Sequence, residues 1–186
     1  MTTSEGRILV IDDDRTNRMM LTYRLEVGGL ETDSAENGLI GLEKLREGHF
    51  DVVLLDIIMP ELDGYATLER LRDDPALRDT PVIMMSSLGE MDSVIRCLEL
   101  GAEDYLPKPL DSLLLVSRVN AVLLKGQLQQ LQARYEEQIS LIADVVAAVH
   151  DAEPAPPALG SLLEAGGAVG RLAREVQRLR RADDGR

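Results

Sequence analysis

The chain has 186 residues, with 33 Asp and Glu against 20 Lys and Arg, and a formal net charge of −13 at pH 7. This acidity argues against nucleic acid or an anionic membrane as a partner, because binding phosphate groups requires clustered Lys and Arg. The single Cys cannot form an internal disulfide, and no apolar run approaches the roughly 20 residues that span a bilayer, so we expect a soluble, cytoplasmic protein.

The first 125 residues alternate short apolar runs with segments of helical spacing. Residues 8–11, 52–55 and 82–85 are continuous apolar runs, as in strands buried on both faces of a parallel sheet. Residues 30–35 and 104–106 predict two weaker strands nearer the edges. Five strand–helix units in succession predict an α/β fold, a doubly wound parallel sheet with helices on both faces.

Four segments between these strands carry apolar residues at helical spacing. The first contains Met19, Met20, Tyr23 and Leu25, and the later ones are marked by pairs such as Leu68 and Leu71. In such a fold the ligand site lies at the carboxyl ends of the strands.

Residues 113–150 predict one long helix that contains no Pro and only one Gly, Gly126. One side of it carries residues alternately four and three apart, interrupted by the polar Gln138: Leu124, Leu128, Leu131, Tyr135, Ile142, Val145 and Val149. Such a heptad seam is typical of a coiled coil, and we expect it to form a homodimer. An antiparallel hairpin with the last segment of the same chain is the alternative, and the direction of helix pairing stays open.

A Pro-rich break at residues 151–157 ends the long helix. A short basic helix is expected beyond it, from about residue 170 to 181. The chain is therefore divided into a first domain at 5–125, a coiled-coil extension of the fifth helix at 126–150, and the break with its short helix at 151–186.

Acidic and polar side chains stand where four of the predicted strands end. They are Asp12, Asp13 and Asp14 after the first strand, Asp56 after the third, Ser86 after the fourth and Lys108 after the fifth. Taken singly, each has an ordinary structural explanation, such as a helix cap, a turn or a surface charge. Taken together, they meet at one edge of the sheet, where converging carboxylates repel unless a divalent cation lies among them. These donors suit Mg²⁺, and a carboxylate in that setting is a nucleophile for phosphoryl transfer.

In order and spacing, these motifs resemble the receiver domain of two-component response regulators. Residues 5–125 are similar to the chemotaxis response regulator. The resemblance rests on the pair Asp12-Asp13, the loop from Asp56 to Pro60, Asp63-Gly64, Ser86, Tyr105 and Lys108-Pro109. It implies a flavodoxin-like sheet of five parallel strands in the order 2-1-3-4-5.

The resemblance also implies a role for each carboxylate. Asp56 is the expected phosphoacceptor. Asp13, Asp56 and the backbone carbonyl of Ile58 are the expected Mg²⁺ ligands, with Asp12 acting through water. Asp14 lies outside the acid pair and is expected to cap the following helix.

Three further residues are implied to contact the phosphoryl group or to switch with it. These are the Ser86 hydroxyl, the aromatic ring of Tyr105 and the Lys108 ammonium, and Pro109 is expected to follow a cis peptide bond.

By this resemblance, the phosphoryl donor is a histidine kinase or a histidine phosphotransfer protein, and the protein is not otherwise an enzyme. We expect it to signal through dimerisation or partner docking rather than a DNA-binding output. One alternative is a truncated regulator of the multidomain cyclase type. Another is a phosphatase with an aspartate nucleophile, which is disfavoured because such enzymes carry a second acid where this chain has Ile58.

Overall fold

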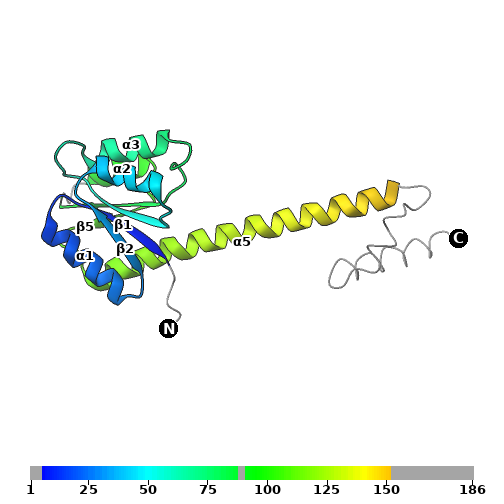
Figure 1. The fold of residues 1–186 in the computed structure, drawn as a ribbon, viewed down its shortest axis with the longest axis horizontal. Coiled ribbons are helices and arrows are strands. Elements are labelled where there is room, and N and C mark those ends of the chain that lie inside the picture. Colours follow the sequence, from blue (N-terminus) through cyan, green and yellow to red (C-terminus); the bar gives the residue numbers. More distant parts are fainter. Residues whose placement is uncertain (1–5, 88–90, 152–186) are drawn as a thin grey trace, which may run out of the picture. The chain divides into compact units, whose positions relative to one another are not determined.

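A computed structural model describes residues 6–87 and 91–151, and the expected helix at 170–181 lies outside these residues. Within them, strands and helices alternate along the chain (Figure 1). The elements are β1 (Arg7–Ile11), α1 (Arg15–Val27), β2 (Glu31–Ala35), α2 (Gly38–Glu47), β3 (Val52–Asp56), α3 (Gly64–Asp73), β4 (Val82–Ser86), α4 (Met91–Glu99), β5 (Asp104–Pro107) and α5 (Ser112–Asp151). The chain forms two compact units, Met1–Gln129 and Gln130–Arg186.

The five strands form one parallel sheet in the order β2-β1-β3-β4-β5. This confirms the predicted fold class and strand order, and the two weaker strands, β2 and β5, lie at the edges. The order reverses between β1 and β3, so the carboxyl ends of these neighbouring strands flank the point at which such sheets bind ligands.

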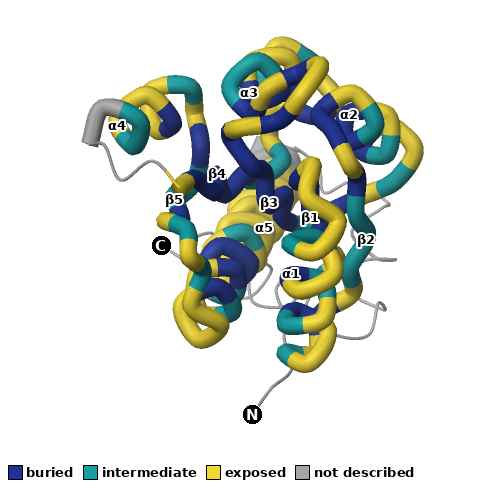
Figure 2. The backbone as a smooth tube through the Cα atoms, turned by 90° about the vertical axis from the view of Figure 1, so that its left-hand side faces the viewer, coloured by how far each residue is buried: buried dark blue, intermediate teal, exposed yellow. Residues whose placement is uncertain are grey.

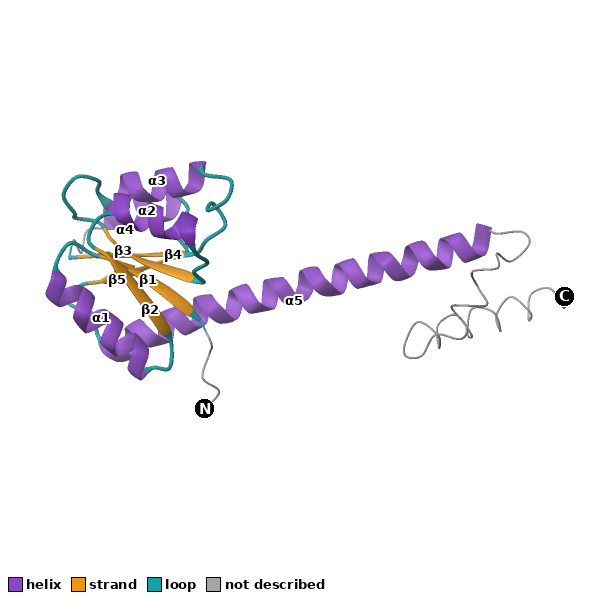
Figure 3. Ribbon diagram, viewed as in Figure 1, coloured by secondary structure: helices purple, strands orange, loops and turns teal. Residues whose placement is uncertain are grey.

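The sheet separates two hydrophobic cores. Helices α1 and α5 lie on one face, and α2, α3 and α4 lie on the other (Figure 3). Consecutive side chains of a strand point to opposite faces, so Met84 of β4 packs with Leu68 and Leu71 of α3, whereas Met85 packs with Leu115 of α5. All residues of β3 and β4 are buried, which explains why their sequences are apolar without alternation (Figure 2).

The apolar residues at helical spacing in α1 are divided between its buried side and its exposed side. Leu25 is buried, but its buried companion in α1 is Leu21, and Met19 and Tyr23 are 61% and 67% exposed. The helix is rich in apolar residues on its outer side as well as on its inner side, so the composition alone did not fix which side faces the sheet.

The end of the sheet opposite the carboxyl edge is held by Arg72 of α3. Its guanidinium donates hydrogen bonds to the carbonyl oxygens of Gly101, Arg78 and Thr80, at 2.8–3.1 Å. These bonds join α3 to the segments that lead into β4 and β5.

Among the described residues, no helix has the length and apolar character that a membrane crossing requires.

Candidate functional site

The loop after β1 presents the acid pair. The Asp12 side chain is fully buried, and its Oδ1 atom accepts hydrogen bonds from the Asp14 amide at 2.9 Å and from Asn17 Nδ2 at 3.5 Å. Asp13 is exposed. The Asp14 carboxylate accepts a hydrogen bond from the Asn17 amide at the first turn of α1, which confirms its expected role as a helix cap.

Asp56 is the last residue of β3, and its side chain is buried at the same edge. The chain beyond it turns sharply into α3. The Ile57 amide donates to the Met85 carbonyl at 3.0 Å, and the Gly64 amide donates back to the Ile57 carbonyl at 2.9 Å. Asp63 then caps α3 by accepting a hydrogen bond from the Ala66 amide. These bonds fix the direction in which the Asp56 carboxylate leaves the sheet.

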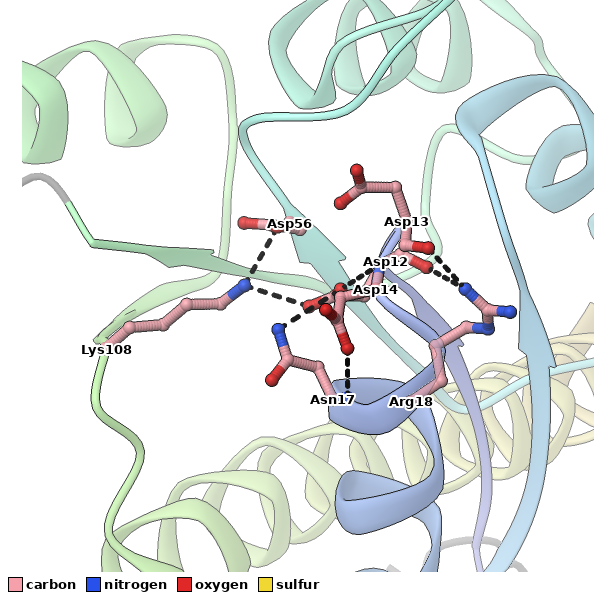
Figure 4. A network of polar contacts seen from close by, with 7 residues as sticks. All are labelled: Asp12, Asp13, Asp14, Asn17, Arg18, Asp56 and Lys108. Carbon is pink, nitrogen blue, oxygen red and sulfur yellow. Dashed lines mark hydrogen bonds and ion pairs between the residues drawn. The ribbon is translucent and has the colours of Figure 1, made fainter.

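Lys108 connects the two buried carboxylates. Its Nζ atom lies 2.9 Å from Asp12 Oδ2 and 2.8 Å from Asp56 Oδ2. Figure 4 draws both contacts as dashed lines. The backbone amide of Lys108 donates to the Ser86 carbonyl at 2.7 Å, and the peptide bond between Lys108 and Pro109 is cis. The ammonium group therefore reaches the centre of the site from the loop after β5.

The three carboxylates form a candidate metal site. One carboxylate oxygen from each of Asp12, Asp13 and Asp56 lies within 4.8 Å of the others. An all-oxygen set with one exposed member suits Mg²⁺, which keeps several water ligands and leaves room for a phosphate oxygen.

The electrostatics of the cluster favour a cation. Burial raises the pKa of the Asp56 carboxyl, and the Asp12 carboxylate acts in the same direction, although Lys108 opposes both. Burial alone would lower the pKa of Lys108, but its hydrogen bonds to Asp56 and Asp12 raise it above its ordinary value. The cluster thus holds three carboxylates and one ammonium group that contacts two of them, and the excess negative charge is what a divalent ion would neutralise.

The other sequence-predicted residues take different positions around this cluster. Ser86 is buried at the end of β4, beside the strand that ends in Asp56. Tyr105 lies in the middle of β5, opposite Met84, and is half-buried. The Ile58 side chain is 57% exposed, two residues beyond Asp56.

The predicted seam lies along α5, which continues without a break from Ser112 to Asp151. Within the described side chains, the five seam members are 45–67% exposed: Leu124, Leu128, Leu131, Tyr135 and Ile142. Val145 and Val149 belong to the same helix, but their side chains lie outside the described part of the chain.

Two residues of the site were missed by sequence reasoning. Asn17 contacts Asp12, and Arg18 donates to the backbone of the acid pair (Figure 4). Both follow the pair by four to six positions along α1, a spacing that returns a helical side chain toward the residues before the helix. That spacing is the signal from which they could have been found.

Comparison with known families gives one match that covers most of the sheet-forming region. The family model described as the response regulator receiver domain matches residues 8–120. The transcriptional activator protein IrlR of Burkholderia pseudomallei is 36% identical over 124 residues, which are 67% of this chain and 53% of IrlR. The chain thus spans about half the length of the curated relatives it matches.

Two solved structures have closely similar folds. One is the crystal structure of a response regulator from Chloroflexus aurantiacus, which is 33% identical in sequence and superposes with a TM-score of 0.62. The match covers 64% of this chain and 98% of the Chloroflexus chain. The receiver domain of Francisella response regulator 1452 has the same identity and TM-score, covering 65% and 98%.

Proposed function

Because the chain belongs to the family of response regulator receiver domains, we propose that it is a phosphorylation-controlled regulator with Asp56 as its phosphoacceptor. The observation that carries this proposal is the meeting of Asp12, Asp13, Asp56 and Lys108 at one edge of the sheet. The phosphoryl donor is a histidine kinase or a histidine phosphotransfer protein.

In the proposed reaction, a carboxylate oxygen of Asp56 attacks the phosphorus of the phosphohistidine as the bond between phosphorus and the imidazole nitrogen breaks. Asp13, Asp56 and the Ile58 carbonyl would hold Mg²⁺, with Asp12 acting through a water ligand. The bound ion supplies positive charge where the phosphoryl oxygens become more negative. Lys108 supplies a second positive charge from the loop after β5.

The phosphoryl group would then bias a conformational switch. Ser86 ends β4 and offers its hydroxyl to a phosphoryl oxygen on Asp56, and Tyr105 lies on the neighbouring β5. The half-buried ring of Tyr105 packs beside the core under α4, so a more inward position of the ring changes the surface of α4, β5 and α5. A phosphate that stabilises one of two existing states is sufficient for this change.

For the output, we propose that two chains dimerise through the seam on α5. The exposed apolar residues of this helix support the proposal, because side chains such as Leu128 and Leu131 are 55% and 47% exposed in the described part of the chain. A second copy presents the same stripe and so covers it by symmetry. A hairpin with the last segment of the same chain remains the alternative.

The curated relatives support the regulatory role more than they support a particular output. IrlR is a transcriptional activator by name, and this chain spans about half of it. We propose dimerisation or partner docking as the output. Such an output requires an exposed apolar surface, and the described part of α5 carries one. A DNA-binding output and a truncated cyclase-type regulator are the competing possibilities.

The experiment is phosphorylation of the full chain by a small acyl phosphate with Mg²⁺, followed by intact mass and light scattering. We expect the mass of one phosphoryl group on the native protein and on Asp79→Asn, and none on Asp56→Asn; Asp79 is an exposed control in the segment that leads into β4, at the opposite end of the sheet. A native protein that gains no phosphate would overturn the proposed function. Phosphorylation without any change in assembly would overturn only the proposed output.

A further inference from the structure

Arg18 makes an unusual pair of contacts behind the acid pair. Its Nη1 atom donates to the backbone carbonyl of Asp12 at 2.7 Å and to that of Asp13 at 2.9 Å (Figure 4). The side chain is mostly buried, with 14% of its surface exposed. The Arg18 amide donates to the Asp14 carbonyl, so this side chain begins in the first turn of α1, next to the loop that it contacts.

Two consecutive carbonyl groups that point toward one nitrogen atom require a bent chain. In an extended strand, successive carbonyl groups point in opposite directions and bond to neighbouring strands. The chain leaves β1 at Asp12, so these two carbonyl groups lose that arrangement and need another donor. Arg18 provides it, and thereby determines the path of the backbone from which both carboxylates project.

The contacts of Arg18 are made with the loop rather than with an acidic side chain. The nearest carboxylate that it pairs with is that of Glu36, at 4.0 Å, and the Glu36 side chain is 65% exposed. Lys108 contacts the carboxylate of Asp12, while Arg18 contacts its carbonyl. The two cations thus act on different parts of the same residue.

We propose that Arg18 is a positioning residue for metal binding, which keeps the carboxylates of Asp12 and Asp13 in the arrangement that binds Mg²⁺. This inference rests on the proposed function, since it concerns the same carboxylates. Residues that orient metal ligands in this way typically change metal affinity by about 10- to 100-fold when they are replaced.

Charge and position predict opposite results when Arg18 is replaced. A positive charge close to a metal site opposes the binding of a cation, so loss of that charge alone would tighten Mg²⁺ binding. Loss of the two hydrogen bonds would release the loop and weaken Mg²⁺ binding. The direction of the change therefore identifies which effect dominates.

The test is calorimetric titration of Mg²⁺ into the full chain without any phosphoryl donor. We expect Arg18→Met to raise the dissociation constant about tenfold and to reduce the rise in melting temperature that Mg²⁺ produces. Arg18→Lys, which keeps a donor and the charge, should recover part of the affinity. Arg15→Met is the matched control, because Arg15 is an exposed arginine at the start of the same helix, and its loss should leave the affinity unchanged or slightly tighter.

An Arg18→Met protein that binds Mg²⁺ as tightly as the native chain, or more tightly, would overturn the inference while leaving the metal site intact. If Arg18→Met does not fold, Arg18→Lys decides: an affinity weaker than that of Arg15→Met supports positioning, and an equal affinity overturns it. Absence of Mg²⁺ binding to the native chain would instead overturn the metal site of the proposed function.

Discussion

At the scale of single residues, Lys108 is shared almost equally between two buried carboxylates. Its distances to Asp12 and Asp56 differ by only 0.1 Å, at 2.9 and 2.8 Å. Burial raises the pKa of the Asp56 carboxyl, although the hydrogen bond from Lys108 acts in the opposite direction. A divalent cation beside Asp56 would leave Lys108 available for a phosphoryl oxygen.

Ile58 carries a prediction about the lifetime of the phosphorylated state. Its exposed apolar side chain has no group that can orient a water molecule toward phosphorus on Asp56. We expect Ile58→Asn to accelerate loss of the phosphoryl group several-fold, measured as the decay of phosphorylated protein after the donor is removed. Ile58→Val, which stays apolar, should leave the rate unchanged, and a marked slowing in Ile58→Asn would contradict the prediction.

The contacts of individual residues were only partly predictable from the sequence. Asp14 was assigned correctly because a carboxylate before a helix has a local role that its neighbours determine. Arg18 was missed because its partners are carbonyl oxygens, whose directions depend on how the chain bends after β1. The backbone conformation of Glu61, with a positive φ of 65°, was not predicted either, because it depends on the three-dimensional course of the turn after β3.

At the scale of elements, the turn from β3 into α3 needs glycine at position 64. A Cβ atom there would meet the Asp56 carbonyl oxygen and would lie 2.8 Å from Ile57 Cα, and both of these neighbours are backbone atoms that cannot rotate away. Gly64 also donates the hydrogen bond that closes the turn. The close approach of this helix start to the strand end is therefore part of how Asp56 is held.

Two glycine-to-alanine substitutions should have opposite effects on stability. We expect Gly64→Ala to lower the free energy of unfolding by about 2–4 kcal/mol and to impair phosphorylation, because the backbone at Asp56 must shift. Gly126→Ala should raise it by about 0.5–1 kcal/mol, because Gly126 lies inside α5 with nothing near its missing side chain. Denaturant unfolding measures both, and a Gly64→Ala protein as stable as the native chain would show that the turn can relax.

The strands were more predictable than the orientation of the helices. Continuous apolar runs identify β1, β3 and β4 because both faces of a central parallel strand are buried. Helix α1 was placed correctly along the chain, but Met19 and Tyr23 lie on its exposed side, whereas Leu21 packs against the sheet. An apolar residue on a helix surface is common, so spacing alone does not separate core from surface.

At the scale of the whole molecule, the proposed dimer gives a prediction about assembly. Leu131→Lys places an unpaired charge in the seam and should weaken dimerisation at least about 100-fold, since burying such a charge costs several kcal/mol. Ser140→Lys adds the same charge to an exposed polar position off the seam and should leave dimerisation unchanged. Sedimentation over a range of protein concentrations measures both.

Equal dimerisation of the two variants would contradict the seam as the interface. A native chain that stays monomeric at every concentration would favour the hairpin alternative. The sequence predicted the length of α5 but left its partner open, because the stripe records only that a surface is apolar and not which chain covers it.

The division of the interior into two cores has a consequence for how such a chain can diversify. The residues that face α2, α3 and α4 do not pack with those that face α1 and α5, because the sheet lies between them. Changes that lengthen α5 or alter its contacts therefore do not disturb the packing of the core on the other face of the sheet. Descendants of such a chain can acquire new outputs on one side while the helices on the other side keep their inherited packing.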